Sequence, residues 1–218
     1  MKADKLTIAV DDEPGQVSAE WMEGEATDAV FVFAHGAGAP MSHPFMTRLS
    51  EALAGYKIAT LRFNFPYMER RSRRPDVPAV AERTVRHAVA EAVRRSKGVP
   101  LIAGGKSFGG RMTSQAMAKE SMDEVSALVF TGFPLHPAGK PGTDRAAHLK
   151  EIKIPMLFLQ GTRDALAEKG LMEGVCNSLE LATLLFLDGA DHSFKAGKND
   201  LIPILADHIQ HWVRQLAR

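Results

Sequence analysis

Ser107 lies in the stretch GKSFGG (105–110), which matches the pattern Gly-x-Ser-x-Gly. The apolar residues before it (99–105) are typical of a buried strand, and residues 111–117 are typical of a helix. A serine on a sharp turn from strand to helix has an exposed hydroxyl, and the flanking glycines relieve crowding there. The spacing fits neither phosphate-binding pattern, G-x-x-x-x-G-K-[ST] or G-x-G-x-x-G. We therefore expect Ser107 to be a nucleophile rather than an incidental serine in a glycine-rich turn.

A nucleophilic serine needs a base, and the base needs a carboxylate that orients it. On a strand-turn-helix site of this kind the chain order is serine, then acid, then histidine. His192 follows the apolar run at 183–189 and precedes the last predicted helix, so we expect it to be the base. Asp164 follows the run at 155–161, and we expect it to orient His192.

Two other aspartates compete with Asp164 for the orienting role. Asp191 is the immediate neighbour of His192, which makes an aligned bond to the far ring nitrogen awkward. Asp188 ends the strand that leads to His192 and is the second choice.

Acyl transfer also needs two amide N–H groups aimed at the developing oxyanion. One is expected from Phe108, the residue after the nucleophile. The other is expected from Ala37, in the small-residue loop HGAGA (35–39) that follows an early apolar run. We expect His35 to order this loop by hydrogen bonding rather than to titrate in catalysis.

Short apolar runs alternate with helical patterns along the chain, which predicts strand-helix-strand units with a parallel sheet. The runs cover 29–34, 58–63, 99–105, 127–132, 155–161 and 183–189. Helices are predicted at 44–54, at 79–95 and from Leu201 to Leu216, and an antiparallel edge hairpin joins LTIAV to VSAEWM. The expected fold is α/β, with a mostly parallel sheet, an antiparallel edge and helices on both faces. Function is expected at the carboxyl ends of the strands.

The composition is that of an ordinary globular protein: 218 residues, 45% apolar and 24% charged. We expect one domain over residues 1–218. A formal net charge of +1 gives no reason to expect a nucleic acid as partner. The single cysteine, Cys176, suits a reducing compartment, and the N-terminus has no signal-peptide pattern. Because no apolar run is long enough to span a membrane, the expected location is the cytoplasm.

The motifs HGAG, GKSFGG, GTRD and DHSF occur in this order, and with them the chain resembles the α/β-hydrolase superfamily from about Ala29 to its C-terminus. It looks most like the small cap-less branch near dienelactone hydrolases, which typically carry cysteine where this chain has Ser107. The strings RFNFPYME and GFPLHPAGKP resemble a subgroup that includes a testis-expressed protein and a subunit of a chromatin acetyltransferase complex. The resemblance implies an α/β-hydrolase fold and a serine hydrolase activity.

Many relatives carry a helical lid where this chain has residues 133–153. That connection can hold one short helix, at about 143–151, but no cap domain, so an open and shallow site is expected. The candidate wall residues for substrate are Met41, Phe65, Tyr67, Met68, Phe133, Leu135, His136 and Phe194. The basic run Arg70–Arg74 is interpreted as a solvated loop, with attraction of an anionic substrate or partner as the alternative.

The predicted activity is hydrolysis of small-molecule carboxylic esters or thioesters through an acyl-enzyme on Ser107. This chemistry needs no cofactor, and no spacing of His, Cys or Asp suggests a metal site. Two alternatives stay open: a catalytically idle hydrolase-fold module that binds a protein partner, and an acyltransferase or peptidase with the same three residues.

Overall fold

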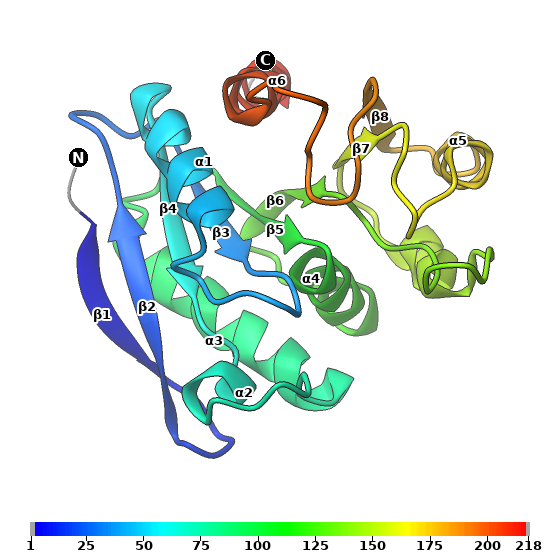
Figure 1. Cartoon of the computed structure of the whole chain (residues 1–218). Helices are drawn as coiled ribbons and strands as arrows, with labels where there is room; N and C mark the ends of the chain where they lie inside the picture. The colour runs from blue at the N-terminus through cyan, green and yellow to red at the C-terminus, as the bar shows by residue number, and fades with distance from the viewer. Residues whose placement is uncertain (1–2, 217–218) are drawn as a thin grey trace.

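The computed structural model describes residues 3–216, and an eight-stranded sheet forms its centre (Figure 1). The strand order is β1-β2-β4-β3-β5-β6-β7-β8. The antiparallel contacts are β1 with β2 and β2 with β4, and the pairs from β4 to β8 are parallel. The strands are β1 (Asp4–Ala9), β2 (Gln16–Met22), β3 (Ala29–Ala34), β4 (Ile58–Phe63), β5 (Leu101–Lys106), β6 (Val125–Thr131), β7 (Met156–Gly161) and β8 (Ala182–Leu187).

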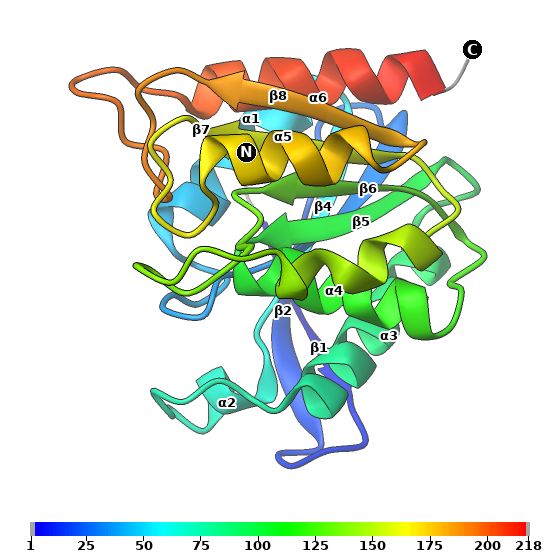
Figure 2. The same cartoon turned by 90° about the vertical axis from the view of Figure 1, so that its right-hand side faces the viewer.

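Helices cover both faces of the sheet, as Figure 2 shows from the side. On one face lie α1 (Pro44–Gly55) and α6 (Ile202–Leu216). On the other lie α3 (Pro78–Arg95), α4 (Phe108–Lys119), the 3-10 helix η1 (Asp144–Glu151) and α5 (Lys169–Asn177). One short helix, α2 (Pro66–Glu69), follows β4. The expected α/β fold with an antiparallel edge is confirmed.

The alternation of side chains along β3 explains why the central strands read as continuous apolar runs. Phe31 and Phe33 pack into the core beneath α1 and α6, while Val30 and Val32 pack into the core beneath α3 and α4. Both faces are therefore dry, and every residue of the strand is apolar. The run that becomes β8 differs: it lies at the sheet edge, and five of its six residues are half-buried.

The predicted helices and strands lie within a few residues of their observed bounds, with three differences. The short helix expected at 143–151 is a 3-10 helix, and no cap domain forms among the residues that the structure describes. Helices α2 and α5 were not predicted, since α2 is a single turn and α5 has only nine residues. Leu216, which the helical pattern places on the same apolar stripe as Leu205 and Ile209, is 39% exposed, whereas those two residues are buried.

None of the helices within residues 3–216 is both long enough and apolar enough to cross a membrane. The parallel strands all end at one edge of the sheet, where the loops after β3, β5, β7 and β8 meet. This edge brings together the residues that the sequence singles out.

Candidate active site

Ser107 occupies a strained turn between β5 and α4. Its backbone angles are φ 51° and ψ −114°, in the left-handed region that a side chain rarely adopts. A Cβ on Gly105 would lie 2.3 Å from the carbonyl oxygen of Ala34, and a Cβ on Gly109 would lie 2.5 Å from the same atom. Both positions are therefore closed to any other residue while β3 lies this near. The two glycines allow the turn at Ser107 to pack directly against the end of β3.

The side chains of Ser107, His192 and Asp164 form one hydrogen-bonded chain. The Oγ atom of Ser107 lies 2.8 Å from Nε2 of His192, and Nδ1 of His192 lies 2.7 Å from Oδ2 of Asp164. Because a carboxylate accepts from Nδ1–H, Nε2 is free to accept from the serine hydroxyl. Three residues from three separate loops thus meet in the order that proton transfer from Ser107 requires.

Asp164 is 5% exposed and is held by two further donors. Its Oδ2 atom accepts from Nε2 of Gln160 at 2.5 Å, and its Oδ1 atom accepts from the amide of Leu166 at 2.8 Å. Gln160 is itself fully buried, and its Oε1 atom accepts from the amide of Phe133. Gln160 was not among the predicted site residues, although a glutamine inside the apolar run MLFLQG is a visible signal.

The two rival aspartates point elsewhere. Asp188 is exposed, and its carboxylate accepts from the hydroxyl of Thr162. Asp191 accepts from the amides of Ser193 and Lys195, so it shapes the loop that carries the histidine.

Lys106 connects the loop that carries His192 to the end of β5. The Nζ atom of Lys106 donates to the carbonyl oxygen of His192 and lies 5.0 Å from the centre of the Phe194 ring. Burial lowers the pKa of Lys106 to about 8. A Cβ on Gly132 would lie 2.8 Å from this Nζ atom, so the glycine leaves room for the amine.

The loop after β3, which carries Ala37, is fixed by buried rings. Nδ1 of His35 donates to the carbonyl of Gly36, and Nε2 accepts from the amide of Phe65. Burial lowers the pKa of His35 to about 4, so its ring is neutral. The Tyr67 hydroxyl donates to the carbonyl of Ala37 at 2.9 Å. The expected ordering role of His35 agrees with these bonds.

The two amides expected to hold an oxyanion, those of Ala37 and Phe108, both lie close to Ser107 in the structure. Ala37 lines the cavity at Ser107, and Phe108 is the first residue of α4, where a helix leaves its N–H groups without internal partners. Within residues 3–216 neither amide donates to a protein acceptor. The positive end of α4 adds to the attraction for negative charge at this point.

A cavity of about 360 Å³ opens at Ser107 and His192. Besides these two residues, its lining is formed by the loop after β3, the start of α1, and single residues from β5 and from the loops after β7 and β8. These further lining residues are Gly36, Ala37, Gly38, Ala39, His43, Phe45, Met46, Lys106, Leu166 and Ser193.

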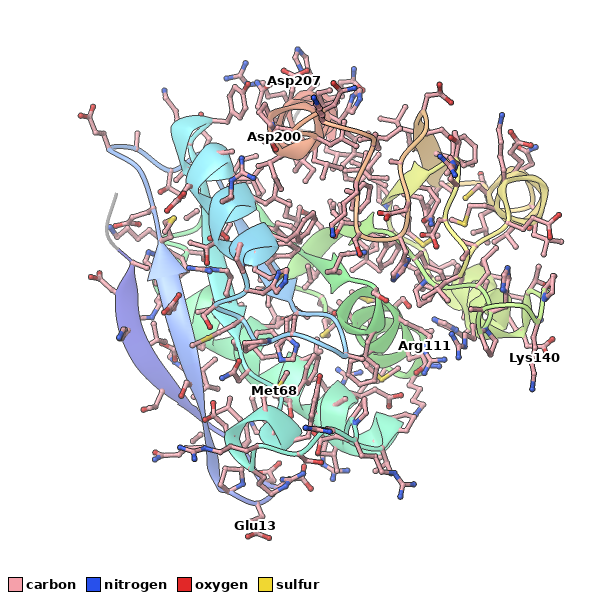
Figure 3. All side chains as sticks on the ribbon, in the orientation of Figure 1. Glu13, Met68, Arg111, Lys140, Asp200 and Asp207 are labelled. Atoms are coloured by element: carbon pink, nitrogen blue, oxygen red, sulfur yellow. The ribbon has the colours of Figure 1, made fainter. Side chains whose placement is uncertain are left out.

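None of the eight predicted wall residues lines this cavity. Three of them follow β4, and Met41 lies in the loop between β3 and α1. Phe65 and Tyr67 are buried and pack around His35, where they support the loop of Ala37 from behind. Met41 is buried, and its main chain bonds to Arg62 and Asn64. Met68 lies on α2, which Figure 3 shows near the lower end of the molecule, and packs against the core.

The other four predicted wall residues are also buried. Phe133 and Leu135 lie in the core beneath α4, because the chain after β6 turns inward. His136 donates to the carbonyl of Pro137 and accepts from the amide of Glu168, so it joins two loops. Phe194 stacks on Phe45 and does not line this cavity, although it lines a neighbouring one. Proximity in the sequence to the site did not predict which side chains line the cavity at Ser107.

The basic segment Arg70–Arg74 does not line the cavity either. Arg70 pairs with Asp76 and also donates to the carbonyl of Glu13, while Arg71, Arg73 and Arg74 are exposed. The interpretation as a solvated loop fits this placement.

Another serine-histidine contact lies outside the cavity. Oγ of Ser114 lies 2.8 Å from Nε2 of His148, but Ser114 donates its own proton to the carbonyl of Arg111 within α4. The histidine is therefore the donor, and Ser114 is not activated. Among the residues described, no three His, Cys, Asp or Glu side chains are grouped to hold a metal ion.

Comparison with known proteins agrees with this geometry. The family described as alpha/beta hydrolase domain matches residues 27–218. Three of the similar solved structures are a dienelactone hydrolase from Anabaena variabilis, the esterase domain of a Rhodothermus marinus protein, and an α/β serine hydrolase without a lid from Xanthomonas campestris. The TM-scores are 0.79, 0.75 and 0.74, and the sequence identities are 20%, 17% and 22%, in the same order. The alignments cover 98%, 99% and 99% of this chain, and 97%, 99% and 95% of the others.

Proposed function

The chain belongs to the alpha/beta hydrolase family, and from that premise we propose that it is a serine hydrolase that cleaves carboxylic esters or thioesters through an acyl-enzyme on Ser107. The observation that carries the proposal is the chain of hydrogen bonds from Ser107 through His192 to Asp164. Neighbours that are named esterase and serine hydrolase support the same reaction class.

In the acylation step, Oγ of Ser107 attacks the carbonyl carbon while its proton passes to Nε2 of His192. The new C–O bond pushes the carbonyl electron pair onto oxygen. Asp164 holds the imidazole in the required tautomer and stabilises the imidazolium. When the intermediate collapses, the bond to the leaving oxygen or sulfur breaks, and the leaving group takes the proton from His192.

The amides of Phe108 and Ala37 stabilise the oxyanion while it exists. These N–H donors stabilise the oxyanion most strongly where the site holds little water. The hydrogen bonds of Tyr67 and His35 hold the Ala37 loop in position before the reaction begins. Water then attacks the acyl-enzyme, with His192 again taking the proton, and the carboxylic acid and free Ser107 are regenerated.

The two alternatives predict different behaviour. An idle binding module has no use for an activated serine, and the hydrogen bonds that join Ser107, His192 and Asp164 support catalysis instead. A transferase or peptidase would use the same three residues but would pass the acyl group to an acceptor other than water, or start from an amide.

Labelling with a fluorophosphonate probe, followed by peptide mapping, tests the proposal. We expect one labelled residue, Ser107, and turnover of short p-nitrophenyl esters at the same site. Ser107→Ala should remove both labelling and turnover in a folded protein, whereas Ser114→Ala should change neither. Labelling elsewhere, or full turnover by Ser107→Ala, would reject the assignment. Product analysis with added alcohols and amines distinguishes hydrolysis from transfer.

A further inference from the structure

A second cavity, also of about 360 Å³, adjoins the one at Ser107. The two cavities share Phe45 and Ser193 as wall residues, so they meet at the residue directly after His192. The second cavity is bounded by the loop after His192, the start of α6 and one side of α1. It therefore extends the site beyond the reacting atoms.

The side chains at this second cavity are mainly cationic. Arg48, Lys195 and Lys198 line it, against a single acidic residue, Asp200. The Asp200 carboxylate is already satisfied by Arg48 and by the amide of Ile202. Lys195 and Lys198 are exposed, and within residues 3–216 neither forms an ion pair with a carboxylate. The cavity thus offers two free positive charges.

The segment that presents these lysines is a defined turn. Ala196 and Asn199 form an antiparallel bridge, and Gly197 between them has φ +60°. At the start of the turn, the amide of Lys195 is held by the Asp191 carboxylate. The same carboxylate accepts from the amide of Ser193, so one side chain holds both the start of the lysine turn and the loop of the proposed base.

The chemistry at His192 decides which part of a substrate reaches this cavity. His192 must give its proton to the leaving oxygen or sulfur, so the leaving group lies beside Nε2. Ser193, the residue after His192, lines both cavities, so the second cavity adjoins the residue that gives this proton. The acyl part is bonded to the carbonyl carbon in a different direction from the leaving group. The second cavity therefore faces the alcohol or thiol part of the substrate.

We propose that the cavity lined by Lys195 and Lys198 binds an anionic group on the alcohol or thiol part of the substrate. The substrate class is then an ester or thioester whose leaving group carries a carboxylate or a phosphate. This inference rests on the proposed hydrolase function and narrows it.

The test compares two series of butyrate esters. One series uses ω-hydroxy carboxylic acids of increasing chain length as the alcohol, and the other uses the matching uncharged carboxamides. We expect kcat/KM to favour the carboxylate by about tenfold at the chain length that reaches the lysines, mainly through a lower KM. The preference should shrink as ionic strength rises, because salt screens exposed charges.

The variant Lys195→Ala/Lys198→Ala should lose this preference and keep its activity on the carboxamide esters. Lys140→Ala/Lys153→Ala is the matched control, since both of these lysines are also exposed, and Figure 3 shows Lys140 far from Asp200. The control should keep the preference.

Three results would overturn the inference. The first is equal kcat/KM for the two series at every chain length, and the second is a preference that survives the double lysine variant. In both of these cases the hydrolase function stands, because the carboxamide esters still turn over. The third is no turnover of either series together with no labelling of Ser107, which rejects the hydrolase function as well.

Discussion

The amine of Lys106 donates a hydrogen bond to the main-chain carbonyl of His192, and so joins the last residue of β5 to the loop after β8. The rings of Phe194 and Phe45 lie 5.0 Å and 5.9 Å from the same nitrogen. The residue next to the proposed nucleophile is thus bonded directly to the proposed base. The contact was not anticipated, although Lys106 is part of the GKSFGG motif.

Replacing Lys106 with Met should change how stability depends on pH. Burial lowers the pKa of the amine from 10.5 to about 8. Between these two values the folded protein holds a neutral amine, while the unfolded chain still binds a proton. By linkage, the free energy of unfolding of the wild type should rise relative to Lys106→Met across this window, by roughly 1 kcal/mol per pH unit. Urea unfolding from pH 7.5 to 10.5 measures the difference.

Lys140→Met is the control for this measurement, because Lys140 is exposed. Its stability should follow that of the wild type at every pH. A difference between wild type and Lys106→Met that stays constant from pH 7.5 to 10.5 would contradict the lowered pKa.

Asp164→Asn should cost two to four orders of magnitude in kcat, and Asp188→Asn should cost less than about twofold. Asparagine at 164 cannot hold the His192 tautomer, and losses of about 10⁴-fold are known for this change in serine proteases. Asp188 bonds only to Thr162 at the surface. Steady-state kinetics on a p-nitrophenyl ester compares them, with circular dichroism to confirm folding. If Asp188→Asn lost more kcat than Asp164→Asn, the orienting role would be assigned to Asp188.

Gly109→Ala should destabilise the fold by about 2–4 kcal/mol, because the added Cβ would lie 2.5 Å from the carbonyl oxygens of Ala34 and His35. Gly170→Ala, in α5, meets no atom within 4 Å and should stabilise by about 0.5–1 kcal/mol. Chemical denaturation of both variants gives the comparison. Equal stability of the two would show that β3 can move away from the nucleophile turn.

Short acyl chains should be preferred, and emulsions should bring no increase in rate. The cavity at Ser107 holds about 360 Å³, and within residues 3–216 no cap domain shelters a longer chain. We expect kcat/KM to fall from p-nitrophenyl butyrate to p-nitrophenyl palmitate. A sharp rise in rate above the solubility limit of a triglyceride would contradict the open site.

The order of strands and helices could be predicted because each element is specified locally. A strand buried on both faces is apolar at every position, and a helix repeats its apolar face every 3.6 residues. The turn at Ser107 could be predicted for the same reason, since the glycines that it needs lie two residues before and two residues after the serine. The narrower resemblance to the testis-expressed subgroup stays a prediction, as do the catalytic roles.

Contacts between distant loops could not be predicted in the same way. Asp164 and Asp188 both end strands, and only the folded chain shows that Asp164 meets His192 while Asp188 faces solvent. The bond from Lys106 to the carbonyl of His192 was missed for the same reason, because the two residues are remote in sequence. The predicted wall residues, such as Phe133, do not line the cavity at Ser107, since a residue's place in the chain does not say where its side chain points.

The sequence by itself determined the fold class, the turn that strains Ser107 and the presence of a histidine and aspartates at strand ends. Tertiary structure alone decided which aspartate meets the histidine, which residues line the cavity, and that a second, cationic cavity adjoins the first. The physical reason is the distance along the chain over which each property is determined. Backbone conformation and burial follow from neighbouring residues, whereas a hydrogen bond between two loops depends on the position of every strand between them.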